Sequence, residues 1–132
     1  MREILFRGKR TENDKWVKGF PYITHGGEHQ IRYYDSESNI ENCSHTVIPD
    51  TLGRFTGLTD RNGVKIFEGD IVRYGDTIHR VVFEQRNGTA YFGLVYAACE
   101  TLPFGHYQDL KQIEVIGNVY DNPELLEVNS DE

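Results

Sequence analysis

The sequence contains only two cysteines, and Cys43 and Cys99 stand far apart without a CxxC spacing. They form neither a disulfide framework nor a zinc ribbon, so we expect reduced thiols in a cytosol. Long hydrophobic runs are also lacking. The longest, residues 94–99, is too short to cross a bilayer, and residues 1–10 have no apolar core of a signal peptide. The sequence therefore predicts a soluble, unsecreted protein that makes no membrane contact.

Proline is scarce as well, with 4 residues beside 13 glycines, eight tyrosines, seven phenylalanines and one tryptophan. This composition is typical of short strands joined by tight turns, and it disfavours both helices and disorder. A chain of 132 residues has room for one domain, or for one barrel that carries an extension. We expect a mostly β protein.

Positive charge is scarce in the second half of the chain. Residues 1–73 carry 11 Lys and Arg against 11 Asp and Glu, whereas residues 74–132 carry 3 against 10, which gives the net charge of −7. A dedicated nucleic-acid binder usually has a larger positive surface, because phosphate contacts supply most of its affinity. The basic neighbourhood that remains lies within residues 1–18.

The segment of residues 55–73 contains two turn signals between short apolar stretches. Asn62-Gly63 predicts a hairpin, because glycine adopts a positive φ without penalty and asparagine tolerates it. A carboxylate at Asp60 can accept backbone N–H bonds across that turn, and Gly69-Asp70 predicts a tight bend before a new strand. Structural turn roles are therefore expected for Asp60, Asn62, Gly63, Gly69 and Asp70.

Short apolar stretches elsewhere predict further strands, of which the first two would pair as a hairpin. Residues 24–42 are polar and Gly-rich, which indicates a mobile excursion with one short strand inside. Residues 81–83 are apolar on both faces, so their strand is expected at the centre of a sheet. Regular strands with tight turns favour a small closed or half-closed barrel. The predicted strands cover residues 4–6, 16–22, 30–34, 71–74, 78–84, 90–96 and 113–120.

A helix is predicted only near the end, where Asn122 suits an N-cap and Pro123 the first helical position. The expected organisation has three parts. Residues 1–54 form an N-terminal β extension with a polar loop, residues 55–128 form the barrel with its short C-terminal helix, and residues 129–132 are a frayed tail.

Two long motifs, residues 55–72 and residues 115–126, resemble the YopX family of phage and prophage proteins, and Phe6-Arg7 followed by Trp16 is a third, weaker match. The resemblance implies a β-rich fold with an SH3-like barrel in the C-terminal half. It also implies a phage or prophage origin, hence the cytoplasm of a host cell, and no established activity. Residues 25–45 depart from the family pattern.

Several side chains invite a metal or catalytic interpretation. Asp60, Glu68 and Asp70 suit Mg²⁺ or Mn²⁺, although the two aspartates also fit hydrogen-bonded turns. A second donor set lies in a polar, Gly-rich loop without a recognised zinc spacing. It consists of His25, His29, Cys43 and His45.

No nucleophile or phosphate-loop motif is present, and His79 alternates with apolar residues as a partly exposed strand residue would. We expect no enzyme activity, no catalytic residue, no metal and no cofactor. Metal-dependent hydrolysis is the alternative that the carboxylates leave open.

Binding is the better-supported class. Aromatic residues crowd the acidic half, where they either fill the core or bind an extended, basic partner protein. This partner-binding set is Tyr91, Phe92, Tyr96, Phe104 and Tyr107. An alternative nucleic-acid contact is the N-terminal hairpin, through Arg7, Lys9, Arg10 and Trp16.

The sequence therefore predicts a non-catalytic protein-interaction module that binds an unknown phage or host protein. Self-association through strand edges would make it a homo-oligomer. The alternative is a nucleic-acid-associated accessory protein.

Overall fold

The computed structural model describes residues 3–35, 40–86, 88–96, 101–103 and 110–126. The chain forms two compact units, Met1–Phe55 and Thr56–Glu132. Strands make up most of both units, so the mostly β prediction is confirmed. No helix in the described part of the chain is long and apolar enough to span a membrane.

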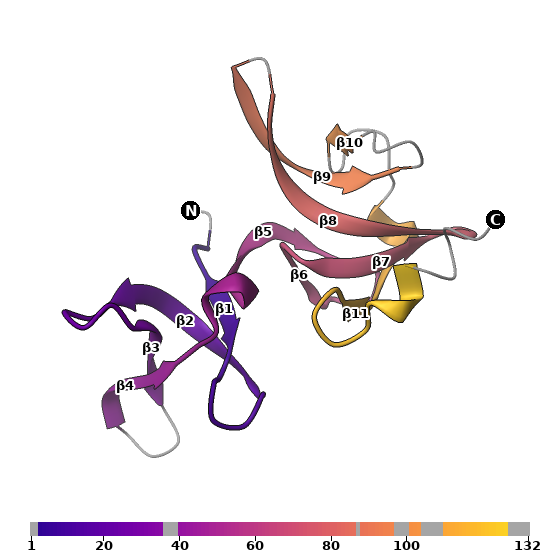
Figure 1. Cartoon of the computed structure of the whole chain (residues 1–132). Coiled ribbons are helices and arrows are strands. Elements are labelled where there is room, and N and C mark those ends of the chain that lie inside the picture. The colour runs from indigo at the N-terminus through magenta and orange to yellow at the C-terminus, as the bar shows by residue number, and fades with distance from the viewer. Residues whose placement is uncertain (1–2, 36–39, 87, 97–100, 104–109, 127–132) are drawn as a thin grey trace. The chain divides into compact units, whose positions relative to one another are not determined.

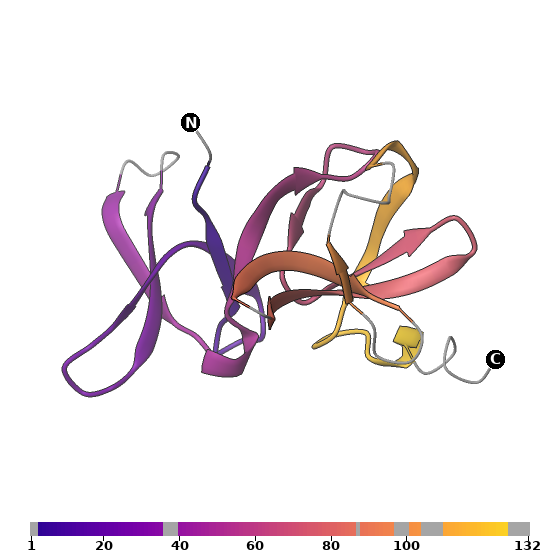
Figure 2. The ribbon, with the colours of Figure 1, turned by 90° about the horizontal axis from the view of Figure 1, so that it is seen from above.

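The first unit is built from four antiparallel strands in the order β4-β3-β2-β1, with β5 added beside β1 (Figure 1 and Figure 2). The predicted hairpin of the first two strands is confirmed, because Lys9 pairs with Trp16 and Phe6 with Gly19. The strand bounds are β1 Phe6–Lys9, β2 Trp16–Ile23, β3 His29–Asp35, β4 Ile40–Thr46 and β5 Gly53–Thr59.

The prediction for residues 24–42 was wrong in part, because β3 and β4 form a second hairpin there. The sequence signal of β4 is weak, since polar residues alternate with only a few apolar ones along it. Pairing along β3 holds it in the sheet. A single 3-10 turn, η1 Pro49–Thr51, connects it to β5.

The core of the first unit consists of Val17, Ile31 and Val47 on one face of this sheet. Gly19 lies on the same face and permits close packing of β2 on β3. A Cβ at Gly19 would stand 2.3 Å from the carbonyl oxygen of Arg32, nearer than any real Cβ contact. Glycine is therefore required at this position by space.

The second unit contains a five-stranded antiparallel sheet in the order β10-β9-β8-β7-β11, while β6 pairs with β5. β8 lies at the centre, which confirms the prediction from residues 81–83. The buried core of the second unit consists of Ile66, Val72, Val81, Leu94 and Ile113. The bounds are β6 Lys65–Phe67, β7 Asp70–Tyr74, β8 Thr77–Arg86, β9 Thr89–Val95, β10 Thr101–Pro103 and β11 Ile113–Asn118.

β10 was not predicted, and it forms one edge of this sheet while β11 forms the other. Within the described residues no strand pairing joins these two edges, so the structure contains two antiparallel sheets and no closed barrel. The SH3-like form is therefore not confirmed. A 3-10 turn, η3 Leu110–Gln112, directly precedes β11.

The predicted C-terminal helix begins as expected, with helical residues 124–126. Leu125 N–H donates to the carbonyl oxygen of Asn122. The side-chain oxygen of Asn122 accepts a hydrogen bond from Asn118 N–H at 3.3 Å, which ties the helix start back to the end of β11. The predicted tail, residues 129–132, lies outside the described residues.

Candidate functional site

One face of the β1–β3 sheet carries alternating basic and aromatic side chains. Residues directly opposite each other in an antiparallel pair share a face, and so do residues two apart along a strand. The register pairs Lys9 with Trp16, Arg7 with Lys18 and Phe20 with Arg32. We call this surface the basic-aromatic face; its residues are Arg7, Lys9, Trp16, Lys18, Phe20, Tyr22 and Arg32.

Two cation–π contacts organise this face. The guanidinium carbon of Arg7 lies 4.7 Å from the ring centroid of Trp16, and that of Arg32 lies 4.3 Å from the ring centroid of Tyr22. Each contact places a positive charge against an aromatic plane at a sheet surface. Phe20 lies between these pairs with 59% of its surface exposed.

Among the residues of β1, β2 and β3, the one carboxylate is that of Asp35 at the end of β3. Other acidic side chains of the first unit lie before β1, in the turns or in η1, namely Glu3, Glu12, Asp14, Glu28 and Asp50. The first unit thus contains both signs of charge, and four of its basic side chains share one face of the sheet. The net charge of −7 conceals this local group of basic side chains.

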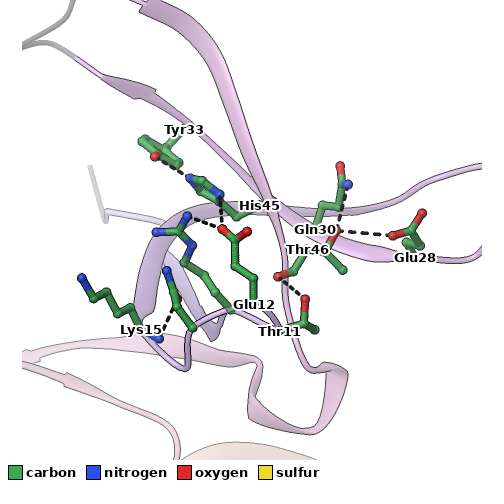
Figure 3. Close-up of polar contacts among 10 residues, drawn as sticks. Thr11, Glu12, Lys15, Glu28, Gln30, Tyr33, His45 and Thr46 are labelled. Atoms are coloured by element: carbon green, nitrogen blue, oxygen red, sulfur yellow. Dashed lines mark hydrogen bonds and ion pairs between the residues drawn. The ribbon is translucent and has the colours of Figure 1, made fainter.

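Arg10 follows Lys9 and so belongs to the opposite face. There it joins a polar network with Glu12, His45 and Tyr33, which Figure 3 labels. Arg10 Nη2 lies 2.6 Å from Glu12 Oε1, and the same oxygen lies 3.8 Å from His45 Nδ1. His45 Nε2 lies 2.9 Å from the Tyr33 hydroxyl. The network attaches the β1–β2 turn to β3 and β4, which gives Arg10 a partner within its own unit.

A second set of polar contacts in Figure 3 converges on Thr46 of β4. Its hydroxyl accepts a hydrogen bond from Gln30 Nε2 at 3.2 Å and donates to Glu28 Oε2 at 3.4 Å. Its carbonyl oxygen accepts a hydrogen bond from the backbone N–H of Thr11 at 3.1 Å. Both turns that flank β2 are thus held to the same residue, so the strands of the basic-aromatic face have a fixed frame.

Of the predicted nucleic-acid set, the structure brings Arg7, Lys9 and Trp16 together and places Arg10 elsewhere. Four members of the face were missed: Lys18, Phe20, Tyr22 and Arg32. The alternation within residues 16–22 contains the signal for three of them, because every second residue there is basic or aromatic. Arg32 could not be assigned without the register of β3.

The turn residues of the longest motif have the structural roles predicted for them. Asp60 Oδ1 accepts hydrogen bonds from the N–H groups of Asn62 at 2.8 Å and Val64 at 2.9 Å. Gly63 and Gly69 have φ values of 79° and 93°.

The second carboxylate of the motif closes the bend. Asp70 Oδ2 accepts the N–H of Phe67 at 2.8 Å. Asp60 and Asp70 therefore both accept backbone N–H bonds at the two turns of the motif.

The other oxygen of Asp60, Oδ2, accepts a hydrogen bond from Val115 N–H at 2.9 Å. This bond connects the two sequence motifs, residues 55–72 and residues 115–126. Burial raises the pKa of Asp60, but the three backbone donors and the nearby Arg61 outweigh burial, and the pKa lies below its ordinary value. The carboxylate is therefore ionised at neutral pH.

The comparisons with known proteins agree with these motifs. Residues 5–127 match the family described as YopX protein. The chain belongs to the YopX family. A solved structure, protein EF1440 from Enterococcus faecalis, is 22% identical, with a TM-score of 0.51, and the match covers 96% of this chain and 99% of that chain. Comparison with the curated proteins yields no match.

The metal alternative receives no geometric support in this YopX-family chain. Across the described ranges, no three His, Cys, Asp or Glu side chains gather as metal ligands would. His29 and His45 lie on neighbouring strands, whereas His25 lies in the exposed β2–β3 turn. His45 is engaged by Tyr33 instead.

The aromatic set predicted for the YopX C-terminal half divides between two faces of the sheet. Phe92 is paired with Phe83, with ring centroids 5.1 Å apart, on one face. Tyr91 alternates to the other face, where its hydroxyl donates to the carbonyl oxygen of Thr101 at 3.4 Å. Tyr96 packs against the core. Phe104 and Tyr107 lie outside the described residues.

His79 is buried, so the prediction of a partly exposed residue was wrong. Its Nδ1–H donates to the carbonyl oxygen of Val95 at 3.0 Å, and Nε2 lies 2.7 Å from Thr77 Oγ1. Its ring also packs against Tyr96, with centroids 4.2 Å apart. Burial lowers the pKa of His79, and the hydrogen bond to Val95 opposes this effect only in part.

Proposed function

We propose that this chain is a non-catalytic binding module whose partner is nucleic acid, bound on the basic-aromatic face. The observation that carries the proposal is the alternation of four basic side chains with three aromatic rings on one face of the sheet. Two Arg–aromatic contacts connect them. Basic side chains neutralise phosphates, and aromatic rings offer planes on which nucleobases can stack.

The charge arrangement sets what this binding would look like. The overall charge of −7 repels a polyanion, so attraction must come from the local surface. Contacts of the four basic side chains with phosphates would release counterions. This predicts a slope of about −3 for the logarithm of the binding constant against the logarithm of the salt concentration. The affinity should therefore fall steeply with added salt.

Fluorescence anisotropy with a labelled oligonucleotide, measured over a series of KCl concentrations, tests the proposal. Arg32→Ala should weaken binding and make the salt slope shallower by nearly one unit. Lys111→Ala, an equal loss of charge in the second unit, is the matched control and should leave binding unchanged. Equal effects of the two variants, or binding without salt dependence, would exclude the face as the contact.

A protein partner is the second candidate, favoured by an exposed apolar surface in the second unit. Phe83 is 43% exposed and lies beside a pocket of about 300 Å³ whose lining includes Glu68, Arg80 and Tyr120. An extended, basic peptide suits the acidic C-terminal half.

NMR titration with a Lys-rich peptide should shift Phe83 and its neighbours if this second candidate is right. Shifts confined to the first unit would contradict it. Sedimentation of the purified chain measures whether the partner is a second copy, joined at strand edges.

The family resemblance supports three finer proposals: a phage or prophage origin, action in the cytoplasm of a host cell, and an SH3-like, half-open barrel in the second unit. The barrel proposal is supported by bonds that connect the β5–β6 turn to β11, since Arg61 N–H donates to the carbonyl oxygen of Ile113 at 2.9 Å. An experimental structure of residues 56–132 within the full chain would test it.

A further inference from the structure

Resting on the proposed function, we infer that the ligand is single-stranded nucleic acid, with an unpaired base stacked on Phe20 and its phosphates on Lys18 and Arg32. Phe20 is the residue that separates this from duplex binding. Basic side chains attract both forms, whereas an exposed aromatic ring can stack only on a nucleobase whose plane is free.

The ring of Phe20 is the open one on this face. Trp16 is covered by Arg7 and Tyr22 by Arg32, as the two cation–π contacts show. Within the described part of the chain, no ring or guanidinium stacks on Phe20, and 59% of its surface is exposed. A large apolar side chain at the centre of a positive surface is suited to a planar, anionic ligand.

The neighbours of Phe20 stand where a backbone would pass. Arg32 is directly opposite Phe20 in the register of β2 and β3. Lys18 is two residues away along β2 on the same face, at about 7 Å for the usual rise of a strand. A nucleotide with its base on Phe20 therefore meets a positive charge on two sides.

Duplex nucleic acid does not satisfy the same arrangement. Its base planes are stacked inside the helix and paired at their edges, so the Phe20 ring would press against sugar and phosphate. A single strand can turn one base outward at little cost. Because every base has a π face, this contact should tolerate any sequence, and DNA and RNA strands should both bind.

Anisotropy of the full chain with a labelled twelve-nucleotide dT strand, its RNA counterpart and a duplex of equal length tests the inference. Phe20→Ala should weaken single-strand binding about tenfold without changing the salt slope, because no charge is lost. Phe20→Trp should restore binding, with tryptophan fluorescence quenched by the stacked base. Val64→Ala, a truncation of an exposed apolar side chain in the second unit, should have no effect.

The outcomes separate this inference from the function on which it rests. If Phe20→Ala leaves single-strand affinity unchanged, or the duplex binds as tightly as the single strand, the single-strand inference is overturned. The proposed nucleic-acid function then still stands if Arg32→Ala weakens binding. If neither strand form binds with salt dependence, both proposals fail. Circular dichroism of each variant establishes that the folded chain is being compared.

Discussion

Asp60 Oδ2 accepts the backbone N–H of Val115 at 2.9 Å, across 55 positions of sequence. Its Oδ1 serves the local turn at the same time. The bond falls where the pairing of β11 with β7 shifts register, between Val115 and Gly117. One carboxylate thus stabilises the β5–β6 turn and also accepts the Val115 N–H at the register shift of the edge strand β11.

Replacing Asp60 by Asn should lower the free energy of unfolding by about 2 kcal/mol. The amide has one acceptor oxygen: if this oxygen serves the turn, an NH₂ group faces Val115 N–H, and if it serves Val115, the turn loses its acceptor. Urea unfolding followed by circular dichroism measures the change. Asp76→Asn, in the exposed β7–β8 turn, is the matched control and should stay within about 0.5 kcal/mol of the parent; an equal loss there would contradict the assignment.

The same carboxylate should contribute to acid unfolding. Its pKa is lowered in the folded protein from the ordinary value of 3.8, so the unfolded chain takes up this proton first as the pH falls. The stabilisation is complete above about pH 4 and is lost as the pH falls through the folded pKa. Unfolding midpoints in urea between pH 5 and pH 2 should decline less steeply in Asp60→Asn than in the parent. Parallel declines would show that the folded pKa is not lowered.

Much of the second unit could be predicted because its signals are local. The hairpin at Asn62-Gly63 and the bend at Gly69-Asp70 depend on residues within a few positions of each other. The bond from Val115 to Asp60 could not be predicted, since it depends on which strand lies beside the turn. β4 was missed for a related reason: polar residues leave it no apolar pattern of its own, and pairing with β3 stabilises it.

The candidate site was predictable only in part. The sequence shows that bases cluster before position 18, and not which side of the sheet each occupies. Arg10 and Lys9 are adjacent in sequence, yet alternation places them on opposite faces. Arg32 reaches the face from another hairpin through the β2–β3 register. Which basic side chains share a face depends on strand pairing, so a count of charged residues along the sequence does not reveal it.

His79→Gln should remove one source of pH dependence near neutrality. The pKa of His79 is lowered from 6.5 by burial, so the unfolded chain binds a proton before the folded protein does. Stability is complete above about pH 6.5 and decreases as the pH falls below it. The parent should therefore lose more stability than His79→Gln between pH 7.5 and pH 5.5, measured by thermal unfolding. His25→Gln, at an exposed turn, should behave as the parent does.

Gly19→Ala should destabilise the first unit by about 3 kcal/mol. The added methyl group would meet the Arg32 carbonyl oxygen and the Ile31 side chain, so β2 and β3 would have to separate. Gly26→Ala is the control, because its nearest neighbour would stand 3.9 Å away. Differential scanning calorimetry compares the two. A Gly19→Ala chain with the stability of Gly26→Ala would show that β2 and β3 are not packed this closely.

Alternation along β2 gives the protein freedom to diversify. Val17 and Gly19 are fixed by the core and by the neighbouring backbone, whereas Lys18 and Phe20 are exposed on the basic-aromatic face. Under the proposed function, substitutions of Lys18 and Phe20 should alter ligand binding and leave the packing of the core intact. Binding specificity on this face could therefore change by single substitutions that do not destabilise the fold.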